Sequence, residues 1–432
     1  MTDQTGSTAL APRTEAGPDR RATVRTEHDV IGFVTRTCFK TGPPRRVGLE
    51  SEWFVEPFAG ARTLEAVRDL LDRAGPLPGG SLVTYEPGGQ LELSTACGDD
   101  LPHAIRLLAE DLRRVDELLD GIGLRRLGVG VHPTRSPERV LHAPRYDAME
   151  RYFDGRRSPT GRAMMTTTAA VQVCVQAGVN PGDVRRRWHR AHALAPVLVA
   201  MFAHSPFRVG EPTGWASTRA RIWQLLDPAR TRPVHDVRSA TEADPAEEWA
   251  KYALDAPVML RRATAGDWPV DPGFTLRDWV RGHPPAPAPT YGDVAYHLTT
   301  LFPPVRPHAW LELRMVDALP DHLWPVAAAV VTALLDDERA ADDGAAAVAP
   351  LWRRRAVDLR AARDGVRDDA VHRAASQCVA AALAALPRLG VDPALVAAVD
   401  DFADRYVDAR RMPADDLLGD DLLDAPRLLE EN

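Results

Sequence analysis

Four short segments of the chain alternate apolar and polar residues with a period of two, which is the pattern of a strand with one buried face. In segment 47–55 the polar face carries Glu50 and Glu52. The same alternation occurs in segments 85–94, 164–176 and 309–316. The sequence therefore predicts strands that share one curved sheet, with an apolar back and a carboxylate-rich front.

The polar faces of these strands combine acids, amides, a thiol and an arginine. They carry Glu50, Glu52, Gln90, Glu92, Ser94, Gln172, Cys174, Gln176, Glu312 and Arg314. Carboxylate oxygens are the ligands that Mg²⁺ prefers, and a bound cation removes the repulsion among clustered acids. A guanidinium suits a phosphate or carboxylate group. The residues alone leave two interpretations open, a metal–phosphate site or solvated strand faces with a surface salt bridge.

Helical patterns follow the strands. Apolar residues recur at helical spacing in 103–119 and 184–202, and the second segment follows a Pro-Gly-Asp start signal. Segment 283–289 is rich in proline and is expected to be a loop or crossover. After residue 320, Ala and Leu dominate, which predicts three or four helices to about residue 409. These helices form either a subdomain or a layer that covers the sheet.

The ends of the chain differ in composition from the middle. Residues 1–25 are rich in Thr, Pro, Gly and charge, and they are expected to form a mobile tail. Residues 415–432 are acidic and are expected to be loosely held. We therefore expect one catalytic domain over 26–414, with a helical layer at about 320–410.

Composition excludes several classes of function. The 432 residues carry a net charge of −8, which does not fit a general nucleic-acid-binding surface. No apolar run approaches the roughly 20 residues of a membrane span, and the first 25 residues lack the apolar core of a signal peptide. The four cysteines form no CxxC pair. We expect a cytoplasmic protein in a reducing compartment, with neither nucleic acid nor membrane as partner.

Several longer segments together resemble the glutamate–cysteine ligases of the plant and proteobacterial type, also called γ-glutamylcysteine synthetases. The most specific are Glu86-Pro-Gly-Gly-Gln-Leu-Glu-Leu-Ser94 and His297-Leu-Thr-Thr-Leu-Phe-Pro303. The others, in the family's order, are 48–52, 145–152, 164–173, 205–207, 222–231, 252–257 and 311–314. Within the family, the Arg- and Ala-rich chain is most similar to the actinobacterial branch that supplies γ-glutamylcysteine to ergothioneine synthesis.

The resemblance implies an α+β, glutamine-synthetase-like fold. In such a fold a curved antiparallel sheet lines the active site, helices pack behind it, and the C-terminal part is mostly helical. It also implies ATP-dependent ligation of the γ-carboxylate of L-glutamate to L-cysteine, through γ-glutamyl phosphate, with Mg²⁺ as cofactor. The substrates are then L-glutamate, L-cysteine and ATP, and the oligomeric state is left open.

Site residues also follow from the resemblance. Its metal-binding acids match Glu50, Glu52, Glu86, Glu92 and Glu312. Its substrate- and phosphate-binding positions match Gln90, Gln172, Arg219, Trp223, Arg230 and Arg314. Arg230 and Arg314 are the expected catalytic residues. By contrast, Cys174 is expected to be a small apolar filler, because the reaction requires no protein nucleophile.

Three positions depart from the family pattern. His204 replaces a usual Asn, Trp53 a usual Lys and Arg232 a usual Gly. The last two put the nucleotide and amine contacts in question, so a ligase of the same fold with a different amine acceptor is the main alternative. A metal-dependent hydrolase that works without ATP, and a non-catalytic regulator that keeps the fold, are further alternatives.

Overall fold

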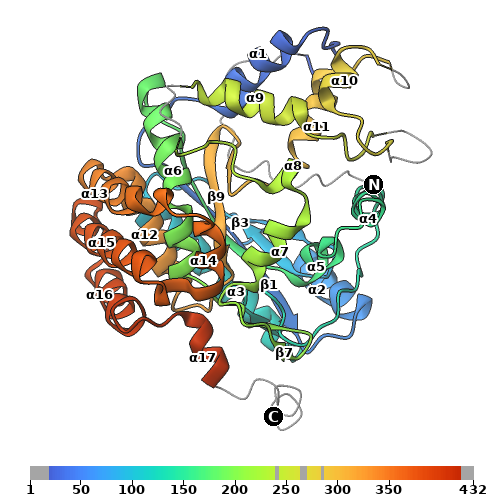
Figure 1. Ribbon diagram of the computed structural model, residues 1–432. Helices are drawn as coiled ribbons and strands as arrows, with labels where there is room; N and C mark the ends of the chain where they lie inside the picture. Colours follow the sequence, from blue (N-terminus) through green and yellow to red (C-terminus); the bar gives the residue numbers. More distant parts are fainter. Residues whose placement is uncertain (1–18, 239–242, 263–269, 284–286, 420–432) are drawn as a thin grey trace.

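The computed structural model describes residues 19–238, 243–262, 270–283 and 287–419 (Figure 1). Among them, seven strands form one antiparallel sheet in the order β2–β3–β1–β5–β9–β8, and β4 pairs with the far end of β1. The strands are β1 (Val47–Glu56), β2 (Leu82–Tyr85), β3 (Leu91–Ser94), β4 (Arg125–Leu127), β5 (Ala170–Gln176), β8 (Val305–Pro307) and β9 (Trp310–Asp317). Strands β6 (Phe207–Arg208) and β7 (Glu211–Pro212) form a separate hairpin.

Helices surround this sheet (Figure 1). They are α1 (Glu27–Cys38), α2 (Ala61–Ala74), α3 (Leu101–Asp120), α4 (Pro144–Gly155), α5 (Gly161–Thr167), α6 (Pro181–Met201), α7 (Thr218–Leu226), α8 (Pro228–Thr231), α9 (Pro245–Asp255), α10 (Leu276–Val280), α11 (Tyr291–Leu298), α12 (Trp324–Asp336), α13 (Glu338–Val348), α14 (Val357–Asp364), α15 (Asp369–Ala385), α16 (Pro393–Phe402) and α17 (Pro413–Gly419). The expected α+β architecture, with helices behind an antiparallel sheet and a mostly helical C-terminal part, is confirmed. We find no described helix whose length and apolar content would let it cross a bilayer.

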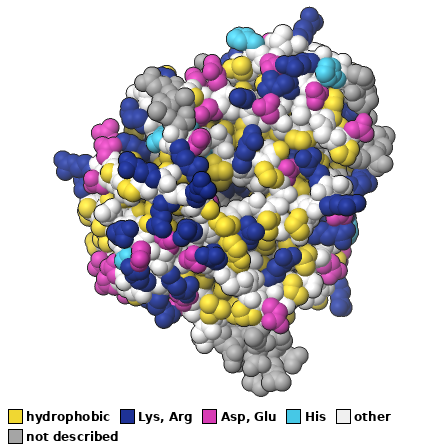
Figure 2. Space-filling view, in the orientation of Figure 1, with side chains coloured by type: hydrophobic (Ala, Val, Ile, Leu, Met, Phe, Trp, Pro, Cys, Tyr) yellow, Lys and Arg dark blue, Asp and Glu magenta, His cyan; other side chains and the backbone are white. Residues whose placement is uncertain are grey.

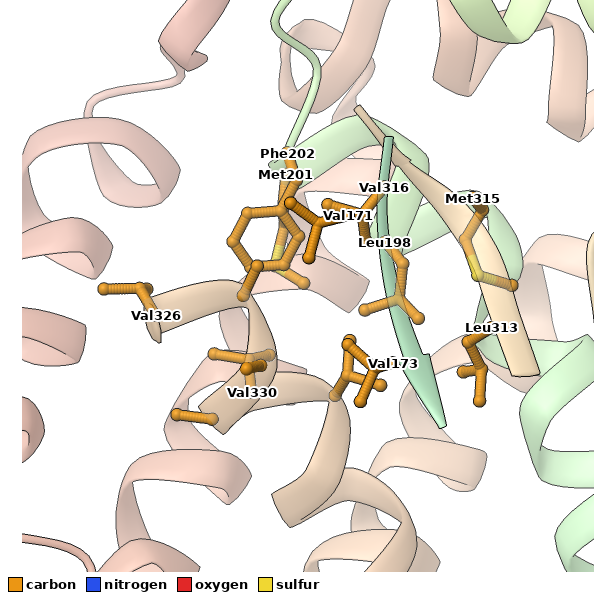
Figure 3. Packing of buried hydrophobic residues seen from close by; sticks show 14 of the residues in the cluster. Val171, Val173, Leu198, Met201, Phe202, Leu313, Met315, Val316, Val326 and Val330 are labelled. Carbon is orange, nitrogen blue, oxygen red and sulfur yellow. The ribbon is translucent and has the colours of Figure 1, made fainter. Parts of the chain in front are cut away.

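The main core lies between the apolar back of the sheet and the helices α3, α6 and α12. Val171 and Val173 of β5 and Leu313 of β9 contribute to it, and Figure 3 shows them beside side chains of α6 and α12. Burying one such aliphatic side chain stabilises the fold by about 1.5–3 kcal/mol. This packing fixes which face of each strand points away from the helices, and therefore where the polar side chains lie.

The two long helices predicted from periodicity are present, and each begins at a polar cap. The carboxylate of Asp100 accepts a hydrogen bond from the backbone N–H of His103 at the start of α3. Asn180 accepts one from the N–H of Asp183 at the start of α6. Both helices begin a few residues before the apolar periodicity does, because proline occupies the first turn of each.

Two predictions about local structure are wrong. The strand predicted from residue 164 begins only at β5, because 161–167 form helix α5, in which Thr166 and Thr167 donate hydrogen bonds to carbonyls four residues earlier. Between residue 320 and about residue 409 the structure has five α-helices, α12–α16, rather than three or four. The carboxylates of Asp337 and Asp368 cap α13 and α15 and so divide the alanine-rich stretch.

Parts of the predicted tails and loop lie outside the described residues, namely 1–18, 284–286 and 420–432. Within the predicted N-terminal tail, Val24 is buried and its N–H donates to the carbonyl of Pro289. At the other end, Asp415 and Asp416 belong to α17 and form ion pairs with arginines. The single catalytic domain over 26–414 stays a prediction.

Candidate active site

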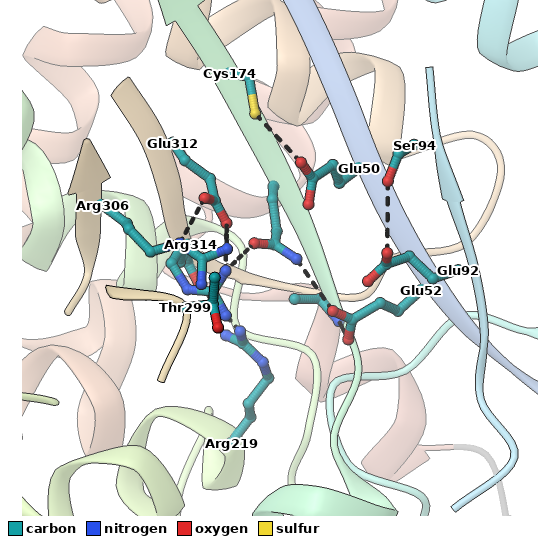
Figure 4. Close-up of polar contacts among 12 residues, drawn as sticks. Glu50, Glu52, Glu92, Ser94, Cys174, Arg219, Thr299, Arg306, Glu312 and Arg314 are labelled. Carbon is teal, nitrogen blue, oxygen red and sulfur yellow. Dashed lines mark hydrogen bonds and ion pairs between the residues drawn. The ribbon is translucent and has the colours of Figure 1, made fainter. Parts of the chain in front are cut away.

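The strand register brings the predicted acids together in rows across the front of the sheet. Glu52 of β1 lies directly opposite Glu92 of β3. Glu50 lies opposite Ser94 on one side and Gln172 of β5 on the other. A third row runs from Gly48 through Cys174 and Glu312 to Arg306 of β8. Because directly opposed side chains have Cβ atoms about 4.5–5.5 Å apart, these rows form one continuous polar surface (Figure 4).

Burial raises the pKa values of four acids of the site, Glu50, Glu52, Glu86 and Glu92. It raises the pKa of Glu50 well above the usual range, and the charges of Glu312 and Glu92 raise it further. Burial, reinforced by Glu92, raises the pKa of Glu52 to about 7 and that of Glu86 to about 8. The pKa of Glu92 is also raised by burial, although the hydroxyl of Thr84 donates to its carboxylate at 2.6 Å. Burial and mutual repulsion therefore disfavour the charged forms of these four acids.

Glu312 differs from the other acids. Burial favours its neutral form, but Arg306 and Arg314 outweigh this effect and lower its pKa to about 2. Arg306 donates two hydrogen bonds to its carboxylate, from Nε at 2.8 Å and from Nη2 at 2.9 Å. Arg314 also forms an ion pair with it. Glu312 is therefore an ionised anchor that fixes two guanidinium groups at the front of the sheet.

Gln172 connects Arg314 to the acid pair at the other end of the site. The guanidinium of Arg314 donates to the side-chain oxygen of Gln172, and the Gln172 amide donates to Glu52 at 3.1 Å. The backbone N–H of Ala170 donates to the second oxygen of Glu52 at 3.0 Å. These bonds explain why the polar face of β5 uses an amide, which can accept from a cation and donate to a carboxylate.

Helix α7 places Arg219 and Trp223 beside Arg314, at the polar front of the sheet. Nη2 of Arg219 donates to the backbone carbonyl of Arg314 at 3.0 Å. The guanidinium carbons of Arg219 and Arg314 each lie 5.9 Å from the centre of the Trp223 ring. The arginines and the indole thus border the end of the acid cluster that contains Glu52.

Asp317, which the sequence analysis missed, holds this arrangement in place. Its buried carboxylate accepts hydrogen bonds from the hydroxyls of Ser205 at 2.6 Å and Ser217 at 2.9 Å, and it lies 3.8 Å from Nη1 of Arg219. The backbone N–H of Arg219 also donates to the Ser205 hydroxyl. Arg306 was missed too, because it lies on the three-residue strand β8.

Replacing Asp317 with asparagine should therefore destabilise the protein. An amide can keep one acceptor oxygen, but its NH₂ group would face donors, so we expect a loss of about 2–3 kcal/mol in the free energy of unfolding. Chemical denaturation measures this loss, with Asp404→Asn as the control because Asp404 is exposed. Equal stability of D317N and wild type would contradict the assigned role.

Two of the predicted binding residues donate hydrogen bonds to other parts of the protein. Arg230 is completely buried, and Nη1 donates to the backbone carbonyl and hydroxyl of Thr300, both at 2.9 Å. Its other terminal nitrogen donates to the carbonyl of Pro257. The amide of Gln90 donates to the carbonyl of Thr168 at 2.9 Å. Both residues tie segments together around the site, and their binding roles stay predictions.

The three departures from the family pattern lie away from the acid rows. Trp53 belongs to the apolar back of the sheet, where the guanidinium of Arg126 lies 4.8 Å from its ring. An effect of Trp53 on nucleotide or amine contacts is therefore not expected, which corrects the sequence-based interpretation. The Arg232 guanidinium lies 5.4 Å from the ring of Tyr252. His204 is buried and donates its backbone N–H to Asp317.

Cys174 lies on the polar surface, but its environment disfavours a nucleophile. Its thiol is 3.9 Å from a carboxylate oxygen of Glu50. Burial, together with the charges of Glu50 and Glu312, raises the pKa of the thiol well above its usual value. A thiol that stays protonated is a poor nucleophile, which agrees with the expected filler role.

Comparisons with known proteins identify the family of the chain. Residues 46–420 match the family described as glutamate-cysteine ligase family 2 (GCS2). Glutamate–cysteine ligase EgtA of Mycobacterium tuberculosis (strain ATCC 25618 / H37Rv) is 40% identical over 393 residues, which cover 89% of this chain and 88% of that protein. EgtA of Mycolicibacterium smegmatis is 39% identical over 421 residues, which cover 94% and 95%. The chloroplastic glutamate–cysteine ligase of Arabidopsis thaliana is 31% identical over 70% of this chain and 62% of its own length. The chain belongs to glutamate–cysteine ligase family 2.

Proposed function

We propose that this protein uses ATP to join the γ-carboxylate of L-glutamate to the amine of L-cysteine, forming γ-glutamylcysteine, ADP and phosphate. The observation that carries this proposal is the row of acids with raised pKa beside Arg219 and Arg314, in a chain of this family. The likeness to the proteins named EgtA supports a product that feeds a low-molecular-weight thiol, with ergothioneine first among the candidates.

The donor chemistry of the site fits Mg²⁺. Glu50, Glu52, Glu86 and Glu92 would hold the ion, because their oxygens are hard ligands and burial, together with neighbouring acids, raises their pKa values in the metal-free protein. Among the described residues, no three acids, thiols or imidazoles converge as a preformed metal site. Bound Mg²⁺ would neutralise charge on the phosphates of ATP.

The protein's own residues position the reacting groups. The γ-carboxylate of glutamate attacks the γ-phosphorus of ATP, ADP leaves, and the amine of cysteine then displaces phosphate from γ-glutamyl phosphate. Such transfers depend on alignment and on charge stabilisation more than on covalent help from the protein. Arg314, held by Glu312 and Gln172, presents a fixed cation to the transferring group, and Arg219 supplies a second one nearby.

Isotope transfer tests the acyl phosphate step. Glutamate labelled with ¹⁸O in its γ-carboxylate should deliver one ¹⁸O atom to the released phosphate, because the carboxylate oxygen becomes the bridging atom. Mass analysis of phosphate measures the transfer, and parallel reactions with a panel of amines test for an acceptor other than cysteine. Unlabelled phosphate would exclude γ-glutamyl phosphate as the intermediate.

The raised pKa values also predict how pH and Mg²⁺ change stability. The folded acids stay protonated up to about pH 7–8, whereas unfolded glutamates ionise near pH 4.5. Between these values the folded state binds more protons, so the stability of the metal-free protein falls as the pH rises. We expect the melting temperature to fall by about 3–8 °C between pH 6 and 8.5.

Mg²⁺ should restore more of this stability at pH 8.5 than at pH 6, because it competes with protons for the same oxygens. Differential scanning fluorimetry with and without Mg²⁺ measures both effects, and Glu52→Gln should reduce the pH dependence. A melting temperature that is independent of pH, or an equal Mg²⁺ effect at both pH values, would contradict the assignment.

A further inference from the structure

A groove of about 620 Å³ lies between helices α2 and α3, next to the start of strand β4 and away from the acid cluster. Its apolar floor consists of Leu70, Leu118, Ile122 and Leu124. The three leucines are only partly buried, and Ile122 is 45% exposed. Apolar side chains that lie together and open to water are typical of a surface that another segment covers.

The rim of this groove is cationic. Arg62, Arg73 and Arg114 line it, and none of the described lining residues is acidic. Arg73 lies 3.7 Å from Asp69. Arg114 lies 3.4 Å from Glu117. Both pairs are exposed, so they contribute little and leave the arginines able to attract another anionic group.

Positive charge alone does not distinguish the groove, because lysine and arginine side chains are spread over the whole face of the molecule in Figure 2. The distinguishing feature is the combination of three arginines with an apolar floor. This combination fits a segment that carries acidic side chains beside leucines.

We propose that this groove binds the chain's own segment 420–432, which follows α17 in the sequence and lies outside the described residues. Its sequence is Asp-Asp-Leu-Leu-Asp-Ala-Pro-Arg-Leu-Leu-Glu-Glu-Asn. The segment has five acidic side chains, one arginine and four leucines, so it complements both the rim and the floor of the groove. This inference does not depend on the proposed reaction.

The position of α17 allows the segment to reach the groove. Leu417 of α17 and Leu127 of β4 line the same pocket and pack against the same small apolar cluster. Leu124 of the groove precedes Leu127 by three residues, which is about 10 Å along an extended chain. The 13 residues of the segment can extend over about 40 Å, so they span this distance.

Docking within one chain needs only a modest intrinsic affinity. Tethering gives an effective concentration on the order of 1 mM, so an intrinsic Kd of about 1 mM is enough to fill half of the grooves. Burial of two of the four leucines is sufficient for that affinity. Because α3 packs against β1, the docked segment would also support the strand that carries Glu50 and Glu52.

Disulfide trapping in the full-length protein tests the assignment. Ile122→Cys combined with Leu428→Cys should form a disulfide within one chain, and mass analysis of the linked peptides identifies it. The matched control is Val179→Cys with the same Leu428→Cys. Val179 is 47% exposed and follows the end of β5 that pairs with the start of β1, whereas β4 pairs with the other end of β1. The first pair should link at least about tenfold faster than the control pair.

Charge reversal at the rim tests the electrostatic part of the proposal. In the Ile122→Cys, Leu428→Cys background, Arg62→Glu should slow the linkage by about fivefold, and added salt should weaken this effect. Arg339→Glu, at an exposed position on α13, should leave the rate unchanged.

Hydrogen exchange provides a second measurement that needs no added cysteine. Replacing Leu428 and Leu429 with serine should speed amide exchange in residues 118–124 by at least about threefold and leave exchange in α15 unchanged. Equal linkage rates for the two cysteine pairs, or unchanged exchange in 118–124, would overturn the proposal. A disulfide between two chains would overturn it as well, because the occupant would then belong to a second copy.

Discussion

Replacing Glu50 with glutamine should lower kcat by at least about a thousandfold, which corresponds to about 4 kcal/mol of lost transition-state stabilisation. Glu50 lies in the middle of the polar surface, between Ser94 and Gln172, and next to the thiol of Cys174. A glutamine keeps the shape but cannot carry the negative charge that a divalent cation needs.

The same substitution should leave the protein folded. Burial and neighbouring acids already disfavour the charged form of Glu50, so a neutral amide resembles the state that the metal-free protein favours. We expect the melting temperature at pH 8 to be unchanged or higher. Steady-state kinetics and scanning fluorimetry measure the two effects, with Glu65→Gln on the exposed face of α2 as the control. Full activity of E50Q would exclude Glu50 from the site.

Arg314→Lys should lower kcat by about 100- to 1,000-fold, in the range seen when one fixed charge-stabilising donor is removed. A lysine keeps the positive charge, but its single ammonium cannot bridge Glu312 and Gln172 in the geometry of the guanidinium. The cation would then no longer be fixed where charge develops, so kcat should fall more than the KM for ATP rises.

Initial-rate kinetics with varied ATP separate the effect on kcat from the effect on the KM for ATP in R314K. Arg339→Lys, an exposed arginine on α13, serves as the matched control and should behave like the wild type. A rise in the KM for ATP with kcat unchanged would mean that Arg314 contributes only to ground-state binding.

Strand alternation was enough to predict the polar surface. Glu50, Glu52 and Glu92 share one face because side chains alternate along β1 and β3, and their apolar neighbours pack against helices. The alternation could not predict which residues of neighbouring strands pair with each other. This pairing depends on turns and on contacts between residues far apart in the sequence.

Asp317 shows why part of the site escaped prediction. Side chains alternate between the two faces of a strand, and Glu312 and Arg314 were predicted to lie on the polar face. By this alternation, Asp317 would lie on the apolar face. The pairing of β5 with β9 includes one extra residue of β9 between the pairs Val171–Val316 and Val173–Leu313. This bulge reverses the alternation, so Asp317 lies opposite Ala170, which shares the face of Gln172. A single sequence carries no clear signal for such a bulge.

The roles of the arginines were equally hidden, because the chain has 51 of them. Arg306 lies on a strand of three residues, too short for a convincing pattern, yet it neutralises Glu312. Arg230 was predicted to bind substrate from its place in a motif, and that role stays a prediction; the structure adds that its terminal nitrogens donate to Thr300 and to the carbonyl of Pro257. Only the three-dimensional contacts distinguish these cases.

The most direct test of the central claim is ADP release from Mg²⁺-ATP with L-glutamate, with L-cysteine present or omitted, followed by mass detection of the product. The proposed function predicts that full ADP release needs both amino acids and that γ-glutamylcysteine appears in equal amount. ADP release that gains nothing from cysteine would contradict cysteine as the acceptor. No ADP release from the folded protein under any of these conditions would contradict the ligase function itself.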